Sequence, residues 1–437
     1  MTETRRIKVE TLTRVEGEGA LDIRISGDVI EDVRLAIYEP PRFFEALLKD
    51  RSLEDVPDIT ARICGICPIA YQMTAVHALE SALGVGISPE IRRLRRLLYC
   101  GEWIESHALH MHMLHAPDFF GVHSAMELAS RFPDEVNRGL RLKKHGNDLL
   151  EVLGGRAVHP VNVAVGGFYR APPKGDLIRL IPDFEWGLQA AADATRWVAG
   201  FDFPEFDRDY EMVALSHPDE YPLNEGRIRS TAGLDIASED YHRHFREQHV
   251  SHTTALQSVM TDSAVADGAG RCYFVGPLAR INLNRDRLSP LARRTADEIG
   301  FVTPCRNPFQ SIIARGLEVI HAYEEALDIL RDYRPPRPSR SAYEYRSGEG
   351  MAATEAPRGL IYHRYAVCDE GKVVSADIIP PTSQNQKQIE DDLRMFLPDI
   401  LSDDDQVTAA ECERLIRSYD PCISCATHFL TVNVVRS

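Results

Sequence analysis

Two Cys-x-x-Cys pairs are the groups in this chain best suited to chemistry. Cys64 and Cys67 form the first pair, and Cys422 and Cys425 form the second. Each spacing puts two thiols about one turn apart, close enough to hold a single soft metal from one side. The other five of the nine cysteines are scattered, which is typical of buried, unligated thiols. The spacing alone fits structural zinc, an iron–sulfur cluster or nickel, and two remote pairs favour zinc.

The residues that flank the cysteines separate these metals. The pairs stand within Arg62-Ile-Cys-Gly-Ile-Cys-Pro68 and Asp420-Pro-Cys-Ile-Ser-Cys-Ala-Thr-His428, and two further motifs are Arg14-Val-Glu-Gly-Glu-Gly19 and Glu355-Ala-Pro-Arg-Gly359. In these motifs, and in their order along the whole chain, the sequence resembles the large subunits of nickel-iron hydrogenases. A zinc site requires none of these flanks, so the resemblance moves the interpretation from a structural metal to a catalytic one.

The resemblance implies that the four cysteines hold a nickel-iron centre. Cys64 and Cys422 would be terminal ligands of nickel, while Cys67 and Cys425 would bridge nickel to an iron that carries two cyanides and one carbon monoxide. Bridging thiolates leave open positions on both metals, whereas a closed tetrahedral site would be structural only.

Four more residues are implied around the open face of that centre. Arg358 would hydrogen-bond one cyanide with a fixed cation. Thr382 would donate to the other cyanide, and Pro357 would be a further cofactor-binding residue. Asp420 would pack beside Arg358 over the same open face of the centre.

The resemblance also assigns a proton acceptor and a second metal site. Glu16 would take the proton, because a partly buried carboxyl can act as acid and base near neutral pH; Glu18 is expected to be solvated. Glu45 and His428 would bind a magnesium or other divalent ion, with the backbone carbonyl of Ile378 as third protein ligand. A hard ion with several waters fits such oxygen ligands.

Two positions depart from the family pattern. Tyr71 stands where many members have histidine, and Ser106 stands where many membrane-linked members have aspartate. Both changes resemble the cytoplasmic, nicotinamide-linked branch, and the sulfhydrogenases in particular. A histidine-rich stretch contains His107, His110, His112 and His115, which we expect to be core histidines that line the site without binding metal.

The electrons must leave through other subunits. The remaining cysteines are too scattered to hold a cluster, so we expect an iron–sulfur small subunit beside Cys64 and Glu16. A flavin-containing NAD(P) diaphorase and further iron–sulfur subunits would bind FAD and NAD(P), because this chain has no strand-Gly-x-Gly-x-x-Gly-helix unit. A maturation endopeptidase would remove residues 429–437 after His428.

Charge and hydropathy exclude several partners. The chain has 50 Lys and Arg against 66 Asp and Glu, a net charge of −16 that opposes binding to nucleic acid or anionic lipid. No window approaches the roughly 18 apolar residues of a spanning helix, so no direct membrane insertion is expected. The N-terminus lacks a secretory pattern, which predicts a cytoplasmic protein.

The elements that position these residues are predicted to form one α+β domain, residues 1–437, that is mainly α. A β-rich N-terminal lobe (1–60) would contain an antiparallel sheet over residues 6–38, and a helical body (61–333) would contain a long-helix bundle. Its helices are expected at 70–84, 89–115, 123–153, 177–199, 239–266 and 308–332. A C-terminal lobe (334–437) would contain a hairpin at 364–377 and a helix at 384–396. If the two cysteine pairs share one site, both ends of the chain meet in the core.

These observations predict the catalytic subunit of a cytoplasmic nickel-iron hydrogenase that exchanges electrons with NAD(P). Sulfur reductase activity of the complex is compatible with the same branch. A hydrogen sensor and a coenzyme-F420-linked hydrogenase subunit remain alternatives with the same site. From other classes, a structural zinc protein and a non-catalytic scaffold related to the large subunits of respiratory complex I are also considered; the presence of all four cysteines opposes the scaffold.

Overall fold

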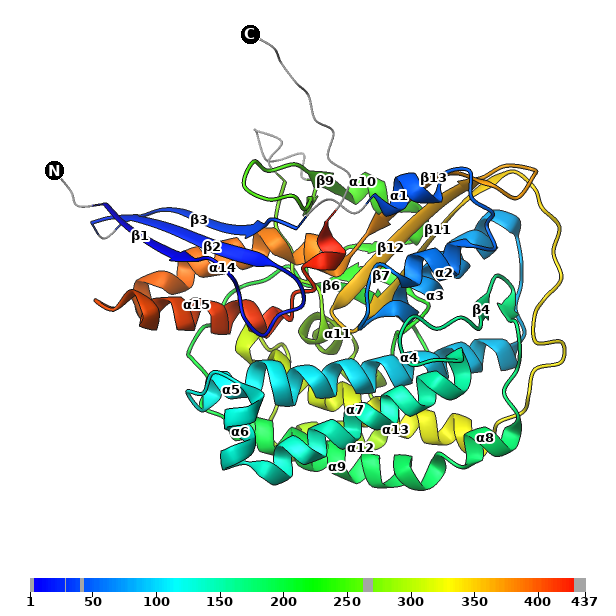
Figure 1. Ribbon diagram of the computed structural model, residues 1–437, viewed down its shortest axis with the longest axis horizontal. Helices are drawn as coiled ribbons and strands as arrows, with labels where there is room; N and C mark the ends of the chain where they lie inside the picture. Colours follow the sequence, from blue (N-terminus) through cyan, green and yellow to red (C-terminus); the bar gives the residue numbers. More distant parts are fainter. Residues whose placement is uncertain (1–3, 28, 40–42, 262–269, 428–437) are drawn as a thin grey trace, which may run out of the picture.

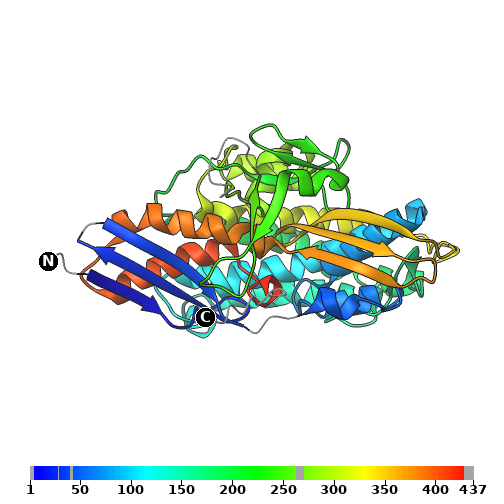
Figure 2. The same cartoon turned by 90° about the horizontal axis from the view of Figure 1, so that it is seen from above.

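The computed structural model describes residues 4–27, 29–39, 43–261 and 270–427. Helices predominate over small antiparallel sheets, so the predicted α+β class is confirmed (Figure 1). Two three-stranded sheets lie toward opposite ends of the longest axis, and long helices lie between and beneath them (Figures 1 and 2). None of the described helices is long and apolar enough to cross a membrane.

The N-terminal sheet consists of β1 (Thr4–Val9), β2 (Gly19–Ser26) and β3 (Val29–Ile37) in consecutive antiparallel pairs. Alternate residues of β2 and the end of β3 are buried, as the period of two predicts for a sheet with one covered face. The sheet packs against α14 (Pro381–Ile400), where the buried Glu390 carboxylate accepts a hydrogen bond from the Leu35 amide at 2.9 Å. The predicted sheet is confirmed, and the loop between β1 and β2 carries Glu16.

The body is a bundle of long helices around α4 and α13. Its members are α4 (Pro89–Leu109), the π-helical η1 (His110–His115), α5 (Ala116–Phe119), α6 (Ala125–Arg131), α7 (Pro133–Gly154), α8 (Lys174–Ile178), α9 (Ile181–Ala199), α12 (Pro290–Glu298) and α13 (Ser311–Arg331). The predicted helix over 123–153 is divided into α6 and α7, because α7 begins at Pro133. The predicted helix over 177–199 is divided into α8 and α9, because α9 has Pro182 in its first turn. Proline fits the first turn of a helix but not its interior.

The second sheet, β11 (Gly348–Ala356), β12 (Gly359–Val367) and β13 (Val373–Ile379), lies on α3 (Pro68–Leu83). Glycines make the close contact possible, because a Cβ at Gly350 would overlap the carbonyl oxygen of Ala78. β12 and β13 confirm the predicted hairpin. The short α1 (Phe44–Leu48) and α2 (Val56–Ala61) lie between β3 and α3 along the chain, and α1 contacts β13 of the second sheet.

The predicted helix over residues 239–266 is wrong. The chain there forms η2 (Ser238–Asp240), one turn of α10 (Tyr241–His244) and a hairpin of β9 (Phe245–Gln248) and β10 (Gln257–Met260); residues 262–269 lie outside the described part. The amide and the hydroxyl of Thr254 both donate to the distant Ile37 carbonyl, at 2.8 and 2.9 Å, so this amide is not available to a helix. Also missed were the sheet of β6 (Val213–Ser216), β7 (Arg227–Ser230) and β8 (Asp235–Ile236), the pair β4 (Val163–Ala164) and β5 (Gly167–Phe168), and α11 (Pro277–Asn284).

Candidate metal centre

The four predicted cysteine ligands meet at one buried point. Cys64 and Cys67 have their sulfurs 2.9 Å apart, Cys422 and Cys425 have theirs 2.7 Å apart, and the Cys64 and Cys422 sulfurs are separated by 3.5 Å. All four sulfurs lie within 4.8 Å of one another, and the side chains are at most 4% exposed. Four free thiols so placed are a donor set for a soft metal, which confirms the expectation that both ends of the chain meet in the core.

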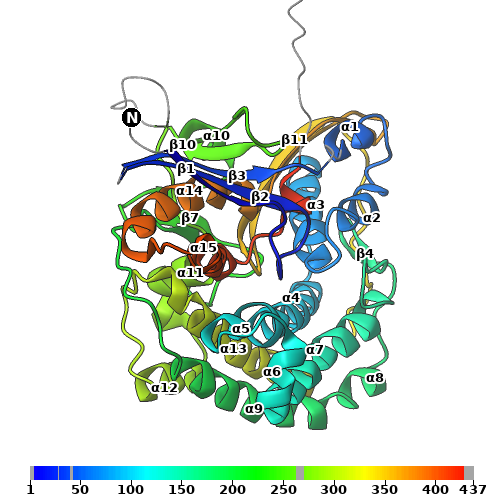
Figure 3. The same cartoon turned by 60° about the vertical axis from the view of Figure 1, so that its left-hand side comes forward.

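Short turns present the two cysteine pairs to each other. The first pair lies between α2 and α3, where the Cys64 sulfur accepts hydrogen bonds from the backbone amides of Ile66 and Cys67. The second pair follows α15 (Asp405–Tyr419), which ends at Asp420 in a left-handed conformation (φ 57°), and leads into η5 (Ser424–Ala426). Figure 3 shows this last segment, in red, between the β1–β2 region and α3.

The electrostatics of the cluster favour anionic sulfur at Cys64. Burial opposes ionisation of that thiol, but hydrogen bonds from the other three thiols and the positive charge of Arg358 outweigh it and lower its pKa. Burial and the neighbouring thiols raise the pKa of Cys422. Loading a metal on all four sulfurs must therefore displace protons from the remaining thiols.

Arg358 lies against the cluster and is itself held by Asp420. Its Nε donates to the Asp420 carbonyl at 2.8 Å, and its Nη2 donates to the Asp420 carboxylate at 3.1 Å. Asp420 and the cysteine sulfurs raise the pKa of this buried guanidinium in spite of its desolvation. Its Nη1 has no hydrogen-bond partner among the described residues. A buried cationic N–H without a partner, beside four thiols, fits a small anionic group bound at the centre.

Thr382 and Pro357 occupy different places around the cluster. The Thr382 hydroxyl oxygen accepts a hydrogen bond from the Cys422 amide at 3.0 Å, so its own proton is available to another acceptor. The Pro357 carbonyl accepts a hydrogen bond from Arg280 at 3.0 Å. Thr382 is thus in direct contact with a predicted ligand, whereas Pro357 is bonded to Arg280, which lies in none of the predicted motifs.

Glu16 lies at the edge of the cluster. Its carboxylate is 3.1 Å from the Cys422 sulfur and accepts a hydrogen bond from the Ser424 amide at 3.1 Å. Its carbonyl accepts a hydrogen bond from the Ile423 amide at 2.9 Å, which joins the N-terminal loop to the second cysteine motif. Glu16 is half-buried, and Glu18 is exposed as expected. One carboxylate therefore connects a buried sulfur with the surface.

The predicted divalent-ion site is described in part. Glu45 on α1 accepts a hydrogen bond from the Ile378 amide at 2.8 Å. Burial, with the nearby charge of Asp377, raises the pKa of Glu45 to about 7. His428 lies outside the described residues. Glu45 and Ile378 are thus in contact, through the Ile378 amide in place of the carbonyl that was predicted to bind the ion.

The aromatic and histidine residues near the centre are core residues. Tyr71 is fully buried, and desolvation and the cysteine charges raise its pKa; its ring lies 5.8 Å from that of His363. The buried His107 ring contacts Glu318 at 3.0 Å, and that of His110 contacts the Arg417 carbonyl at 2.7 Å. These bonds fit the expectation of packed histidines.

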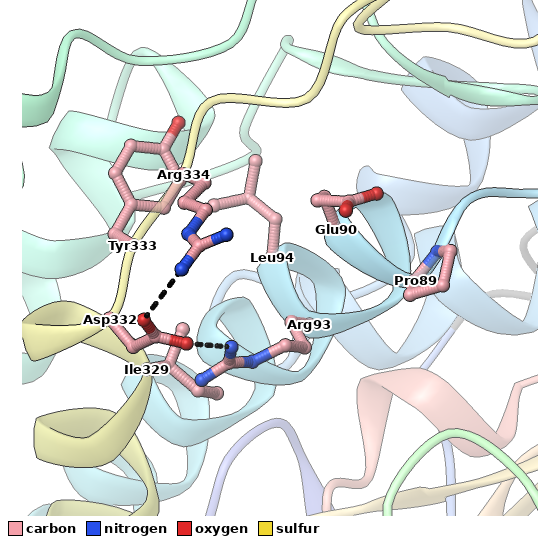
Figure 4. A pocket seen from close by; sticks show the side chains of 8 residues that line it. All are labelled: Pro89, Glu90, Arg93, Leu94, Ile329, Asp332, Tyr333 and Arg334. Atoms are coloured by element: carbon pink, nitrogen blue, oxygen red, sulfur yellow. Dashed lines mark hydrogen bonds and ion pairs between the residues drawn. The ribbon is translucent and has the colours of Figure 1, made fainter.

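A small pocket elsewhere in the bundle has different chemistry. It encloses about 230 Å³ between the start of α4 and the end of α13. In Figure 4 the guanidinium groups of Arg93 and Arg334 both point to the Asp332 carboxylate, at 2.8 and 3.8 Å. None of the predicted site residues lines this pocket, so the cysteine cluster remains the candidate centre.

Comparison with known proteins identifies the family. A family model for nickel-dependent hydrogenases matches residues 42–135 and 312–428. The chain is 33% identical to subunit alpha of sulfhydrogenase 1 from Pyrococcus furiosus over 97% of each chain. It is 26% identical to the HoxS beta subunit of an NAD-reducing hydrogenase from Cupriavidus necator, over 98% of this chain and 95% of the relative.

Solved structures of hydrogenases share the fold. A crystal structure of an NAD⁺-reducing [NiFe]-hydrogenase in the H2-reduced state superposes with a TM-score of 0.84 at 24% identity, covering 98% of this chain and all of the other. The reduced Ni-Fe-Se hydrogenase of D. vulgaris Hildenborough superposes with a TM-score of 0.77. Full-length similarity of this kind, around a buried set of four thiols, shows that the chain belongs to the nickel-dependent hydrogenase family and is a catalytic nickel-iron subunit.

Proposed function

We propose that this chain cleaves H2 heterolytically, and forms it in reverse, for an electron transfer chain that ends at NAD(P). Cys64, Cys67, Cys422 and Cys425 would hold nickel and an iron with two cyanides and one carbon monoxide. When bound, such a centre supplies the open coordination that polarises H2. The observation that carries the proposal is the gathering of four buried thiols beneath an arginine N–H that has no partner among the described residues.

Glu16 is proposed as the group that takes the proton. Its carboxylate is within hydrogen-bond distance of the Cys422 sulfur, and its half-buried position gives it access to the outside. A general base must lie within such reach of the proton that it accepts. The hydrogen bonds from the Ile423 amide to the Glu16 carbonyl and from the Ser424 amide to its carboxylate keep this side chain at the sulfur.

Arg358, Asp420 and Thr382 are proposed to hold the diatomic ligands of the iron. Arg358 offers a free N–H from a guanidinium that Asp420 fixes from behind, and Thr382 offers a hydroxyl proton. Donors that are fixed before the reaction stabilise charge without having to reorganise. Pro357, next to Arg358, would line the same face.

A divalent ion, Mg²⁺ for example, is proposed to bind Glu45, His428 and the backbone at Ile378. The buried carboxyl of Glu45, with a pKa of about 7, has the donor chemistry of such a site, since a bound cation would stabilise its ionised form. Its place would be structural, at the junction between α1 and β13.

Partners complete the electron path. The relatives are named as subunits of hydrogenases, and one of them as NAD-reducing; this supports an iron–sulfur small subunit beside this chain. A flavin-containing NAD(P) diaphorase with further iron–sulfur clusters, a cytoplasmic location and a sulfur reductase activity of the complex are part of the proposal. A maturation endopeptidase would remove residues 429–437.

The test is purification of the chain with its partners, followed by metal analysis, infrared spectroscopy and assays of H2-dependent reduction of NAD⁺, NADP⁺, coenzyme F420 and sulfur. We expect nickel and iron near one each, cyanide and carbonyl stretches, and a preference for a nicotinamide. Stoichiometric zinc without those stretches would overturn the centre. Very slow turnover with every acceptor would favour a sensor, and a tail still attached in active protein, detected by intact mass, would overturn the cleavage.

A further inference from the structure

A second buried arginine, Arg280, forms hydrogen bonds with the backbone just before Arg358. Arg280 lies on α11 and is fully buried. Its Nη1 donates to the Ala356 carbonyl at 2.8 Å, and its Nη2 donates to the Pro357 carbonyl at 3.0 Å. These two carbonyls belong to the residues immediately before Arg358, so the guanidinium of Arg280 fixes the turn from which Arg358 projects.

The guanidinium of Arg280 has little freedom of its own. Glu318 accepts hydrogen bonds from its Nε and Nη2, both at 2.7 Å, and Glu355 accepts one from Nη1 at 3.0 Å. The ring of Trp103 lies 4.4 Å from its central carbon. Tyr221 donates to Glu318 in turn at 2.7 Å. Planar, forked donors that are satisfied from several directions hold one orientation.

The turn itself is packed tightly against the start of α11. Gly359 has φ +134°, and a Cβ there would lie 2.7 Å from Val275 and 2.9 Å from the Gly276 amide. A Cβ at Gly276 would lie 3.2 Å from the Arg358 carbonyl. Close approach of this kind leaves the turn no room for a second conformation.

Charge neutralisation alone does not explain the arrangement. A buried ion pair is weak evidence of stabilisation, because desolvation offsets the attraction between its members. Arg95 forms another buried ion pair in the same chain. It is fully buried, pairs with Glu80 through two hydrogen bonds and also contacts the Ala164 carbonyl. Arg280 differs from Arg95 in that its carbonyl partners adjoin a residue of the metal centre.

We propose that Arg280 is a positioning residue: by holding the carbonyls of Ala356 and Pro357, it sets the place of the Arg358 guanidinium over the four thiols. The role rests on the proposed function, because it acts on the hydrogen bond between Arg358 and an iron-bound cyanide. Glu318 and Glu355 hold Arg280 and contribute only through it.

The experiment is infrared spectroscopy of the purified complex carrying Arg280→Lys, with Arg358→Lys as reference and Arg95→Lys as matched control. Lysine keeps the positive charge between Glu318 and Glu355. Its single ammonium group cannot hydrogen-bond the Ala356 and Pro357 carbonyls together as the planar guanidinium does. We expect the cyanide stretches to shift in the same direction as in Arg358→Lys and by more than the carbonyl stretch. Nickel and iron content should be unchanged, with about 10-fold slower H2 oxidation. Arg95→Lys should leave the stretches in place.

The outcomes separate the two proposals. Wild-type complex without cyanide stretches would overturn the proposed centre. Wild-type stretches that stay unchanged in fully metal-loaded Arg280→Lys would overturn the positioning role alone. If Arg280→Lys does not assemble, Glu355→Gln decides: it weakens one hold on Arg280, so a smaller shift of the same sign supports the role, and an unshifted spectrum contradicts it.

Discussion

The two sides of the cysteine cluster are built differently. On what we call the arginine side, Arg358, Asp420 and Arg315 are at most 2% exposed and are joined by ion pairs and by bonds to backbone carbonyls. On what we call the glutamate side, Glu16 is half-buried in the loop between β1 and β2. The first side has fixed charge and no access to water, and the second has a carboxylate between sulfur and surface.

This contrast in burial indicates which part of the reaction each side can serve. A group that stabilises charge at a metal acts best when it is buried and does not move. A group that passes protons must exchange them with water, so it needs exposure, although not freedom of the backbone. Gly17 has φ +88°, and a Cβ there would lie 2.7 Å from the Ser424 amide, which shows that the glutamate side is also tightly packed.

The largest expected effect is on the glutamate side. Glu16→Gln keeps the shape of the side chain but removes the base, and we expect H2 oxidation to fall about 100- to 10,000-fold. The cyanide and carbonyl stretches should barely change, because the arginine side is untouched. Exposed Glu18→Gln is the control and should keep wild-type rates. Normal turnover in Glu16→Gln would mean that the proton leaves by another route.

Arg358→Lys makes the reciprocal change on the arginine side. Lysine retains the charge but loses the fork that Asp420 now holds, so we expect a loss of about 10- to 100-fold in H2 oxidation with metals retained. Here the cyanide stretches should shift, in contrast to Glu16→Gln. Equal spectra for the two variants would contradict the division between the sides.

Thr382→Val should have a smaller effect. The change leaves the buried Cys422 amide without its acceptor, which costs about 1 to 3 kcal/mol of stability. We expect a lower midpoint of denaturant unfolding and reduced nickel retention after dialysis. Thr382→Ser keeps the hydroxyl and should behave as wild type; if it loses as much as valine, the methyl group and not the hydrogen bond is responsible.

The smallest effect concerns the pH dependence of stability at Glu105, a buried carboxyl that is influenced by the charge of Arg358. Burial raises the pKa of Glu105 to about 7, although the ion pair with Lys143 opposes the shift. Because this folded-state value exceeds the ordinary 4.5, the folded chain binds the proton more tightly, and stability falls as pH rises between those values and levels off above about 7.

Glu105→Gln removes that titration. Between about pH 6 and 8 the wild type should lose about 1 kcal/mol more stability than the variant, measured by denaturant unfolding at both pH values. Parallel curves for the two proteins would show that Glu105 does not titrate in this range.

The sequence predicted the centre well where chemistry depends on local motifs. The flanks of each Cys-x-x-Cys placed both pairs in one site, and the thiols meet as expected. The period of two in residues 6–38 gave the N-terminal sheet. The proposed contacts of Glu16 and Arg358 with the cluster also agree with where the residues lie, although their roles stay predictions.

What depends on distant contacts could not be read from the sequence. Arg280 lies in no motif that marks it, because its partners are 38 to 77 residues away. Glu102, whose carboxylate accepts hydrogen bonds from the amides of Ile69 and Ala70 at the start of α3, was missed for the same reason. The hairpin at residues 245–260 has helix-compatible spacing, but its two strands pair with each other, and Thr254 in its loop donates from its amide and its hydroxyl to the distant Ile37 carbonyl.

The separation of the two cysteine pairs also sets an order of events during protein synthesis. Cys422 follows Cys64 by 358 positions, which take on the order of 20 to 70 s to translate at about 5 to 20 residues per second. Throughout that interval the nascent chain has only two of the four cluster thiols, and Glu16 lacks its contacts with Cys422 and Ser424. A complete set of four sulfurs can exist only after Cys425 has been synthesised, so a metal held by all four cannot be bound before the C-terminal segment docks.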